Sequence, residues 1–165
     1  MPRVWKSTTE PYTPRVELAY LTADLPGTGG RLRVVPEDFR VDEIPLYLPG
    51  GEGEHLYLKV WKRGIATFEA ARRLAAGLDV PERHVSYAGL KDARAVTTQW
   101  MSVPASAADR LEGFVDRRMK ILEHSLHSNK LKLGHLRGNR FRIVVRNDAD
   151  VPFRRVAGFA SGTKF

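Results

Sequence analysis

The sequence contains no cysteine, and none of its apolar runs approaches the length of a membrane-spanning helix. Without thiols the chain forms no disulfide and does no thiolate chemistry, which fits a reducing compartment. A spanning helix needs about 18 or more apolar residues in a row. The first residues, MPRVWKSTTEPYTPRVE, also lack the continuous apolar core of a signal peptide. We therefore expect a cytoplasmic protein that does not bind membranes.

Several motifs of well-known functional sites are missing too. There is no GxxxxGK[ST] phosphate loop, no GxGxxG motif and no GxSxG nucleophile elbow. The five histidines are scattered along the chain. His124 and His127 are three residues apart, but they fall in a stretch with the pattern of a strand, so a zinc site is not expected. The sequence predicts neither a metal nor a cofactor.

Positive charge, in contrast, is abundant and unevenly distributed. The formal net charge is +8 and the pI is about 10.0, which favours polyanionic partners, nucleic acid first. Between His124 and Asn147 there is no acidic residue, whereas the basic residues are Lys130, Lys132, Arg137, Arg140, Arg142 and Arg146. Between Glu37 and Glu54, in contrast, acidic residues outnumber basic ones. Charge alone fits an RNA-binding protein and a protein with a basic surface equally well.

The hydrophobic pattern predicts one domain rich in strands. A chain of 165 residues is long enough for a single domain with a core. Strands are predicted where apolar and polar residues alternate or β-formers cluster, at 31–35, 39–44, 55–61, 85–88, 96–103, 119–127 and 141–146. One helix is predicted from the helical spacing of apolar residues over 68–78, with Thr67 as the N-cap and with Gly77 and Pro81 marking its end, and a second at 105–114. Because strands outnumber helices and connections are short, the predicted fold is α+β with a mixed, largely antiparallel sheet.

Three segments combine residue types that can carry chemistry: VVPEDFRVDEIP (34–45), VSYAGLKDARAVTTQW (85–100) and NKLKLGHLRGNRFRIVV (129–145). In the second, Asp92 lies in a turn between Lys91 and Arg94. A carboxylate that acts as a nucleophile must stay charged when a substrate covers it, and nearby cations favour the charged form. An aspartate in a turn more often caps its own backbone. The residues alone leave both interpretations of Asp92 open.

Phe39 and Asn139 each have two interpretations as well. Phe39 begins a predicted strand, and its pattern favours the core over stacking on an RNA base, an interaction of roughly 1–3 kcal/mol. Asn139 follows Gly138, which is typical of a turn, but its amide could also contact the donor and acceptor edge of uracil. The basic residues around Asn139 suit phosphate contacts. Neither residue identifies a function by itself.

Together and in this order, the segments resemble the pseudouridine synthase D (TruD) family. The resemblance is carried by PEDFRVDE (36–43), GEGEHLYLKVWKRGIAT (51–67), YAGLKDARAVTTQ (87–99) and KLKLGHLRGNRFRI (130–143). The family isomerises uridine to pseudouridine in RNA, typically at position thirteen of tRNA, without metal or cofactor. The resemblance implies a pseudouridine-synthase-like catalytic domain, tRNA as the partner, and Asp92 of GLKDAR as the nucleophile that attacks a uridine flipped out of its stack.

The same resemblance implies substrate-binding residues around the nucleophile. Phe39 would stack on the target base, Asn139 would contact the substrate, and Phe141 would line or support the pocket. Arg33, six residues before Phe39, falls where family members carry a basic residue, and we expect it to pair with the nucleophile and keep it charged. Lys91 is also placed among the substrate-binding residues.

The resemblance ends before the C-terminus. Family members are longer, with an inserted second domain and a returning segment that carries an NYFGxQRFG-like motif, which this chain lacks. We expect a lead-in over 1–30, the N-terminal part of the catalytic domain over 31–147, and the start of a missing C-terminal portion over 148–165. The alternatives are an incomplete fragment that only binds RNA and an unrelated basic protein. We expect a monomer, with a strand edge exposed.

Overall fold

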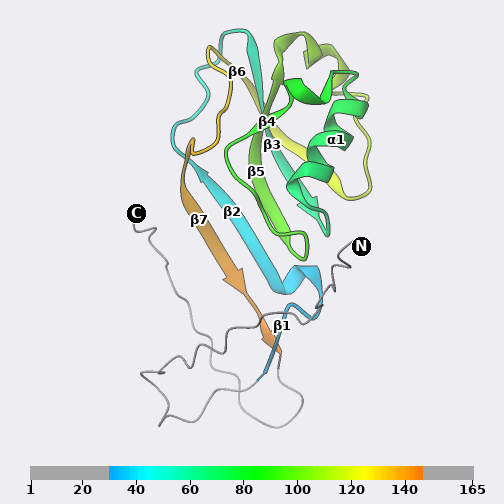
Figure 1. Ribbon diagram of the computed structural model, residues 1–165, viewed down its shortest axis with the longest axis vertical. Helices are drawn as coiled ribbons and strands as arrows, with labels where there is room; N and C mark the ends of the chain where they lie inside the picture. The colour runs from blue at the N-terminus through cyan, green and yellow to red at the C-terminus, as the bar shows by residue number, and fades with distance from the viewer. Residues whose placement is uncertain (1–29, 147–165) are drawn as a thin grey trace, which may run out of the picture.

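The computed structural model describes residues 30–146, which form a sheet with one α-helix packed on it (Figure 1). The strands are β1 Arg31–Leu32, β2 Phe39–Pro45, β3 His55–Arg63, β4 Ser86–Tyr87, β5 Val96–Pro104, β6 Met119–His127, β7 Leu136–Ile143 and β8 Val145–Arg146. The helix is α1 Thr67–Gly77, and 3-10 helices cover Pro36–Asp38, Glu82–His84 and Ala105–Arg110. The expected lead-in and tail lie outside the described residues, apart from Gly30.

The strand order of the main sheet is β6-β3-β5-β2-β7, and β4 pairs with β5 outside this path. Its neighbouring strands are antiparallel, except that β2 and β5 run parallel, with Arg40 opposite Val96. β1 and β8 form a separate antiparallel pair. The predicted α+β fold with a mixed, largely antiparallel sheet is confirmed.

The main hydrophobic core lies between α1 and one face of the sheet. Leu74 of α1 is fully buried and belongs to the same core cluster as Leu58 and Val60 of β3 and Met101 of β5. Burying a side chain of this size contributes about 1.5–3 kcal/mol. Since alternate residues of a strand share a face, the next inward position of β3 is occupied by Lys62, which is also fully buried. A lysine in this position needs internal partners.

The N-terminus of α1 differs from the prediction. Ala66 occupies the N-cap position, and Thr67 is the first helical residue. The Thr67 hydroxyl accepts a hydrogen bond from the backbone N–H of Lys91 at 2.8 Å and donates one to Gln99 Oε1 at 3.1 Å. Thr67 therefore does not cap the helix, because its hydroxyl is used to hold the loop that follows β4.

The start of β7 also differs. The strand predicted at 141–146 covers the end of β7 and all of β8, and β7 itself already begins at Leu136. β2 provides a pairing partner for the earlier residues, with Gly138 opposite Ile44 and Asn139 opposite Glu43. Asn139 is therefore a strand residue, and the prediction of a turn there is wrong, because pairing with β2 overrides the local preference.

Three other predicted elements are shorter in the structure. The first strand ends at Leu32, because Arg33 has a positive φ of 56°. The predicted strand at 85–88 is reduced to β4. The helix predicted at 105–114 is a 3-10 helix over Ala105–Arg110. A segment this short forms too few hydrogen bonds to offset the free-energy cost of nucleating an α-helix.

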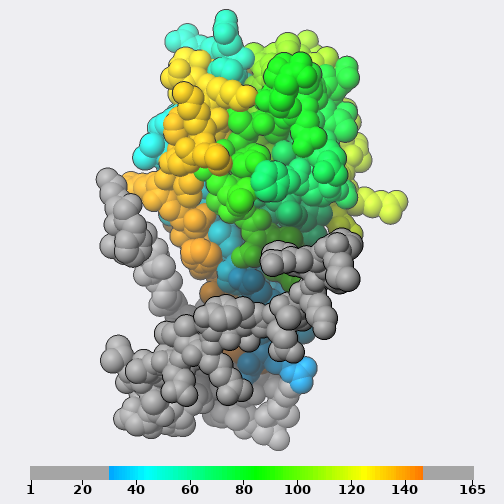
Figure 2. Space-filling model, in the orientation of Figure 1, coloured from blue at the N-terminus to red at the C-terminus, as the bar shows by residue number. Residues whose placement is uncertain are grey.

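β6 and β7 are the edge strands of the main sheet. Figure 2 shows β7 and the loop before it, in yellow to orange, at the surface along one side of the molecule. Phe141 and Ile143 of β7 are 41% and 48% exposed, so this edge presents apolar side chains as well as unpaired backbone groups. Among residues 30–146, no helix has the length and apolar character needed to cross a membrane.

Candidate active site

Asp92 lies in the loop between β4 and β5, near the point where β5 begins beside the start of β2. Its Oδ2 accepts a hydrogen bond from the guanidinium of Arg33 at 3.2 Å. The Asp92 and Arg33 side chains are 46% and 40% exposed, respectively. The carboxylate is thus accessible from solution and also has a cationic partner, as a nucleophile requires.

Arg33 connects Asp92 to an aromatic pair. Its guanidinium carbon lies 3.9 Å from the centroid of the Phe39 ring, which is within the range of a cation–π interaction. Its positive φ is uncommon for a residue with a side chain, and such conformations concentrate at functional sites. Arg33 is thereby held between the carboxylate of Asp92 and the face of Phe39.

The two phenylalanines come from adjacent strands. Phe39 begins β2, Phe141 belongs to β7, and their ring centroids are 5.9 Å apart. Phe39 is only 8% exposed and packs with Val41 and Ala95, whereas Phe141 is 41% exposed. Because Arg33 covers one face of Phe39, an RNA base could reach that face only if Arg33 moved. The ring that is open to solution is that of Phe141.

Asn139 lies two residues before Phe141 on β7, so both side chains project from the same face of the strand. Its Oδ1 atom is buried and has no hydrogen-bond partner within the described part of the chain. Buried polar atoms are nearly always paired, and an exception calls for an explanation. Because this atom is buried, another group could pair with it only after neighbouring atoms moved.

Lys62 supports the Asp92 loop from inside the protein. Its Nζ donates hydrogen bonds to the backbone oxygen of Ile65 at 2.6 Å and to that of Asp92 at 3.2 Å. Burial, with a smaller contribution from the nearby charge of Lys91, lowers the pKa of Lys62 to about 8, while Asp92 acts in the opposite direction. Lys62 was not among the residues predicted for the site, although the alternation of apolar residues in β3 places it on the buried face.

Lys91 points into the protein. Its Nζ lies 2.7 Å from Oε2 of Glu43, and the two side chains are 4% and 1% exposed. Glu43 also accepts a hydrogen bond from the backbone N–H of Trp100 at 3.0 Å. The expectation that Lys91 contacts substrate stays a prediction, but its ammonium already has a buried partner in Glu43, which was not expected from the sequence.

The turn before Asp92 is held by a second set of buried contacts. Gln99 Nε2 donates to the backbone oxygen of Gly89 at 3.3 Å, and Gln99 also receives the hydrogen bond of Thr67. The structure therefore brings the exposed side chains of Arg33, Asp92 and Phe141 together around the buried ring of Phe39. Beneath them is an internal framework of Lys62, Lys91, Glu43, Thr67 and Gln99.

The chemistry open to this arrangement is nucleophilic or general-base catalysis by a carboxylate beside aromatic rings. In residues 30–146, no group of three or more His, Asp or Glu side chains is placed to hold a metal ion.

Comparison with known proteins identifies the family. The family model for tRNA pseudouridine synthase D (TruD) matches residues 15–161. A tRNA pseudouridine synthase D from Anaeromyxobacter sp. (strain Fw109-5) is 56% identical over 126 residues, which are 76% of this chain and 36% of that protein. The enzyme of that name from Geotalea daltonii is 55% identical over 126 residues, or 76% of this chain and 32% of the relative.

The fold agrees with these matches. A solved structure assigned to tRNA pseudouridine synthase D (TruD) from Methanosarcina mazei has a TM-score of 0.72 and 37% identity, and covers 79% of this chain and 30% of that one. This chain spans about a third of the length of the curated relatives that it matches. On these matches and this fold, the chain belongs to the tRNA pseudouridine synthase D (TruD) family.

Proposed function

We propose that this chain carries the nucleophile and part of the substrate pocket of an enzyme that isomerises uridine to pseudouridine in tRNA, at position thirteen. The observation that carries the proposal is the pairing of the accessible Asp92 carboxylate with Arg33 next to the Phe39 and Phe141 rings. It occurs in a chain whose relatives are named tRNA pseudouridine synthase D. The enzyme would act in the cytoplasm as a monomer, without metal or cofactor.

The reaction needs no co-reactant. The bond between the sugar and N1 of uracil breaks, and a bond between the same sugar carbon and C5 forms. The proton at C5 is released and N1 gains one, so the product is an isomer of the substrate. Asp92 attacks the sugar carbon that bears N1 and forms a bond to it as the bond to N1 breaks. The bond to Asp92 breaks in turn when C5 of the rotated uracil attacks the same carbon, which restores the carboxylate. The detached uracil must stay in place while it rotates.

The neighbouring residues would support these steps in different ways. The guanidinium of Arg33 favours the charged form of Asp92 when RNA excludes water from the site. The exposed ring of Phe141 offers a stacking surface for a base, and Phe39 becomes available if Arg33 moves toward the RNA backbone. Asn139 Oδ1, which has no partner among residues 30–146, could accept a hydrogen bond from an N–H group of uracil once the atoms that bury it move.

A second candidate function is RNA binding without turnover. It is favoured by the net charge of +8 and by the absence of acidic residues between His124 and Asn147. It predicts salt-sensitive RNA binding, because phosphate contacts release counterions. Both functions use the basic character of the chain, and only the first requires Asp92.

Tritium release from tRNA labelled at C5 of uridine tests the proposal. We expect release by the parent chain and by Asp79→Asn, and none by Asp92→Asn. Asp79 is an exposed aspartate outside the site, with a φ of 49° that asparagine tolerates, so its replacement is a matched control.

Turnover by the Asp92→Asn variant would refute the nucleophile. If the parent chain binds tRNA but releases no tritium, the second candidate function is supported.

A further inference from the structure

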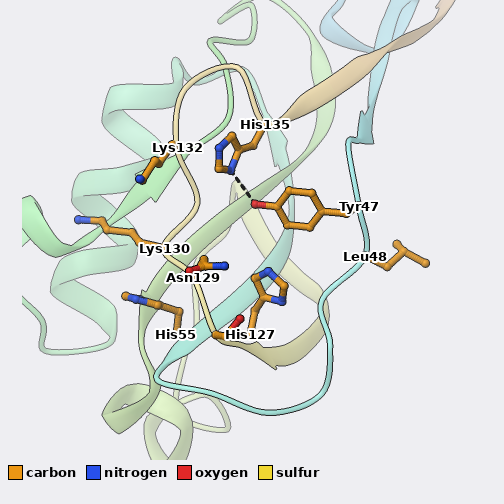
Figure 3. A pocket seen from close by; sticks show the side chains of 9 residues that line it. Tyr47, Leu48, His55, His127, Asn129, Lys130, Lys132 and His135 are labelled. Carbon is orange, nitrogen blue, oxygen red and sulfur yellow. Dashed lines mark hydrogen bonds between the residues drawn. The ribbon is translucent and has the colours of Figure 1, made fainter.

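A separate pocket of about 750 Å³ opens at the other end of the main sheet (Figure 3). Tyr47 follows the end of β2, His55 begins β3 and His127 ends β6, whereas Asp92 lies beside the start of β2. At about 3.3 Å per residue, the length of β2 separates the two places by roughly 20 Å. The pocket is therefore not part of the Asp92 site.

The wall of this pocket is made of rings and hydrogen-bond donors. Tyr47 and His135 come from facing segments, and the Tyr47 hydroxyl lies 2.6 Å from His135 Nδ1. The rings of Tyr47 and His127 stack with their centroids 5.2 Å apart. The backbone N–H of Gly50 donates to His127 Nδ1 at 3.1 Å, so neutral His127 carries its proton on Nε2.

Two lysines add positive charge on one side. Lys130 and Lys132 belong to the loop between β6 and β7. Lys130 donates to the backbone oxygen of Arg83 at 3.3 Å, while Lys132 is exposed. None of the described residues that line the pocket is acidic, although Glu52 and Glu54 are close in sequence to His55. The lining therefore attracts anions.

The dimensions and chemistry of the pocket fit a nucleotide. Its volume is within the range of about 300–1,000 Å³ of small-molecule sites. Ammonium and imidazole N–H groups suit a phosphate, and tyrosine and histidine rings suit a base. Its histidines do not form a metal-binding group with other described side chains.

We propose that this pocket binds a phosphodiester and the adjacent nucleotide of the RNA substrate, at a position other than the uridine that reaches Asp92. This inference rests on the proposed function, because it takes the ligand to be RNA. The loop that carries the lysines also contacts the segment between β4 and Asp92, through a hydrogen bond from the Gly134 N–H to the Ala88 oxygen at 2.8 Å. RNA held here would be anchored to the same framework that holds the nucleophile.

The test measures binding of a labelled oligouridine by fluorescence anisotropy over a range of salt concentrations. It uses the chain with Asp92→Asn, so that turnover plays no part. Lys132→Gln is compared with Lys120→Gln, which makes the same charge change at an exposed lysine of β6 outside the pocket. Tyr47→Phe removes the hydroxyl that meets His135 without changing charge.

We expect Lys132→Gln to reduce the slope of log K against log salt by about 0.7, as for one lost phosphate contact with a single strand. At about 50 mM salt this corresponds to roughly eightfold weaker binding. Lys120→Gln should leave the slope unchanged. Tyr47→Phe should weaken binding about threefold at constant slope, because His135 loses the internal hydrogen bond that positions its ring in the pocket.

Equal effects of Lys132→Gln and Lys120→Gln would overturn the proposal, because they would show that only net charge matters. Unchanged binding in both Lys132→Gln and Tyr47→Phe would overturn it too, and would point to a protein segment as the occupant. The readout is independent of catalysis. If binding depends on the pocket while the parent chain releases no tritium, the proposed function fails and this inference stands.

Discussion

Lys62 is fully buried, yet within the described residues its ammonium meets two backbone oxygens, those of Ile65 and Asp92, instead of a carboxylate. Burial lowers its pKa from an ordinary value of 10.5 to about 8. Between these two values the unfolded chain binds a proton that the folded chain has released. The free energy of unfolding therefore increases with pH in this window.

Replacing Lys62 with methionine should remove this dependence. The two pKa values correspond to about 3 kcal/mol in total, of which about 2.5 kcal/mol falls between pH 7 and pH 10. At pH 7 the variant avoids the cost of a buried charge but leaves two carbonyls without this donor, at about 1–3 kcal/mol each. Relative to the variant, the parent should gain about 2.5 kcal/mol on going from pH 7 to pH 10.

Urea denaturation of the parent chain, Lys62→Met and Lys120→Met at both pH values measures this difference. In the difference between the unfolding free energies of the parent and a variant, the contributions of all titratable groups that both chains contain cancel. Lys120 is exposed, so its replacement should not change the pH dependence. If the unfolding free energies of the parent and Lys62→Met change in parallel between the two pH values, the account of Lys62 as a buried charge is wrong.

Two further predictions concern buried carboxylates. Lys91→Met should reduce the free energy of unfolding by about 3–5 kcal/mol, because it leaves the Glu43 charge buried and unpaired. Urea denaturation should show that the double variant Lys91→Met/Glu43→Gln recovers part of this loss. If the double variant recovers none of it, the pairing of Lys91 with Glu43 is not the cause. Asp38 accepts two hydrogen bonds from Arg146 at 2.8 Å, which lower its pKa below 3.8. Its contribution to stability is therefore present above pH 3.8 and is lost as pH falls through the lower, folded-state pKa. In Asp38→Asn, the free energy of unfolding should depend less on pH in that range, as measured by denaturation at a series of acidic pH values. An unchanged pH dependence would show that the Asp38–Arg146 pair contributes little to stability.

Much of the fold could be predicted because it depends on hydrophobic alternation. The predicted strands at 55–61, 96–103 and 119–127 lie within β3, β5 and β6, where tertiary pairing and local pattern agree. The early start of β7 could not be predicted, since Gly138 and Asn139 favour a turn and only their pairing with β2 makes them a strand.

The site was predictable in part and for different reasons. Asp92, Phe39, Phe141 and Arg33 were expected from family resemblance, and the structure places them in successive contact. Their roles stay predictions. The direction of the Lys91 side chain could not be inferred, because neighbours in a turn need not point the same way. Its partner Glu43 is far away in sequence and becomes close only through the sheet.

The parallel pairing of β2 with β5 has a consequence for how the protein folds. Asp42 and Thr98, which are hydrogen-bonded across this pair, are separated by 56 residues. Closing such a loop has an entropic cost that must be met before the contact stabilises anything, so pairs of this kind form slowly. β3 and β5 can already share a core with α1 before β2 docks. Since Phe39 belongs to β2 and Asp92 precedes β5, the two sides of the site come together only when this long-range pair has formed, so assembly of the site depends on contacts that are distant in sequence.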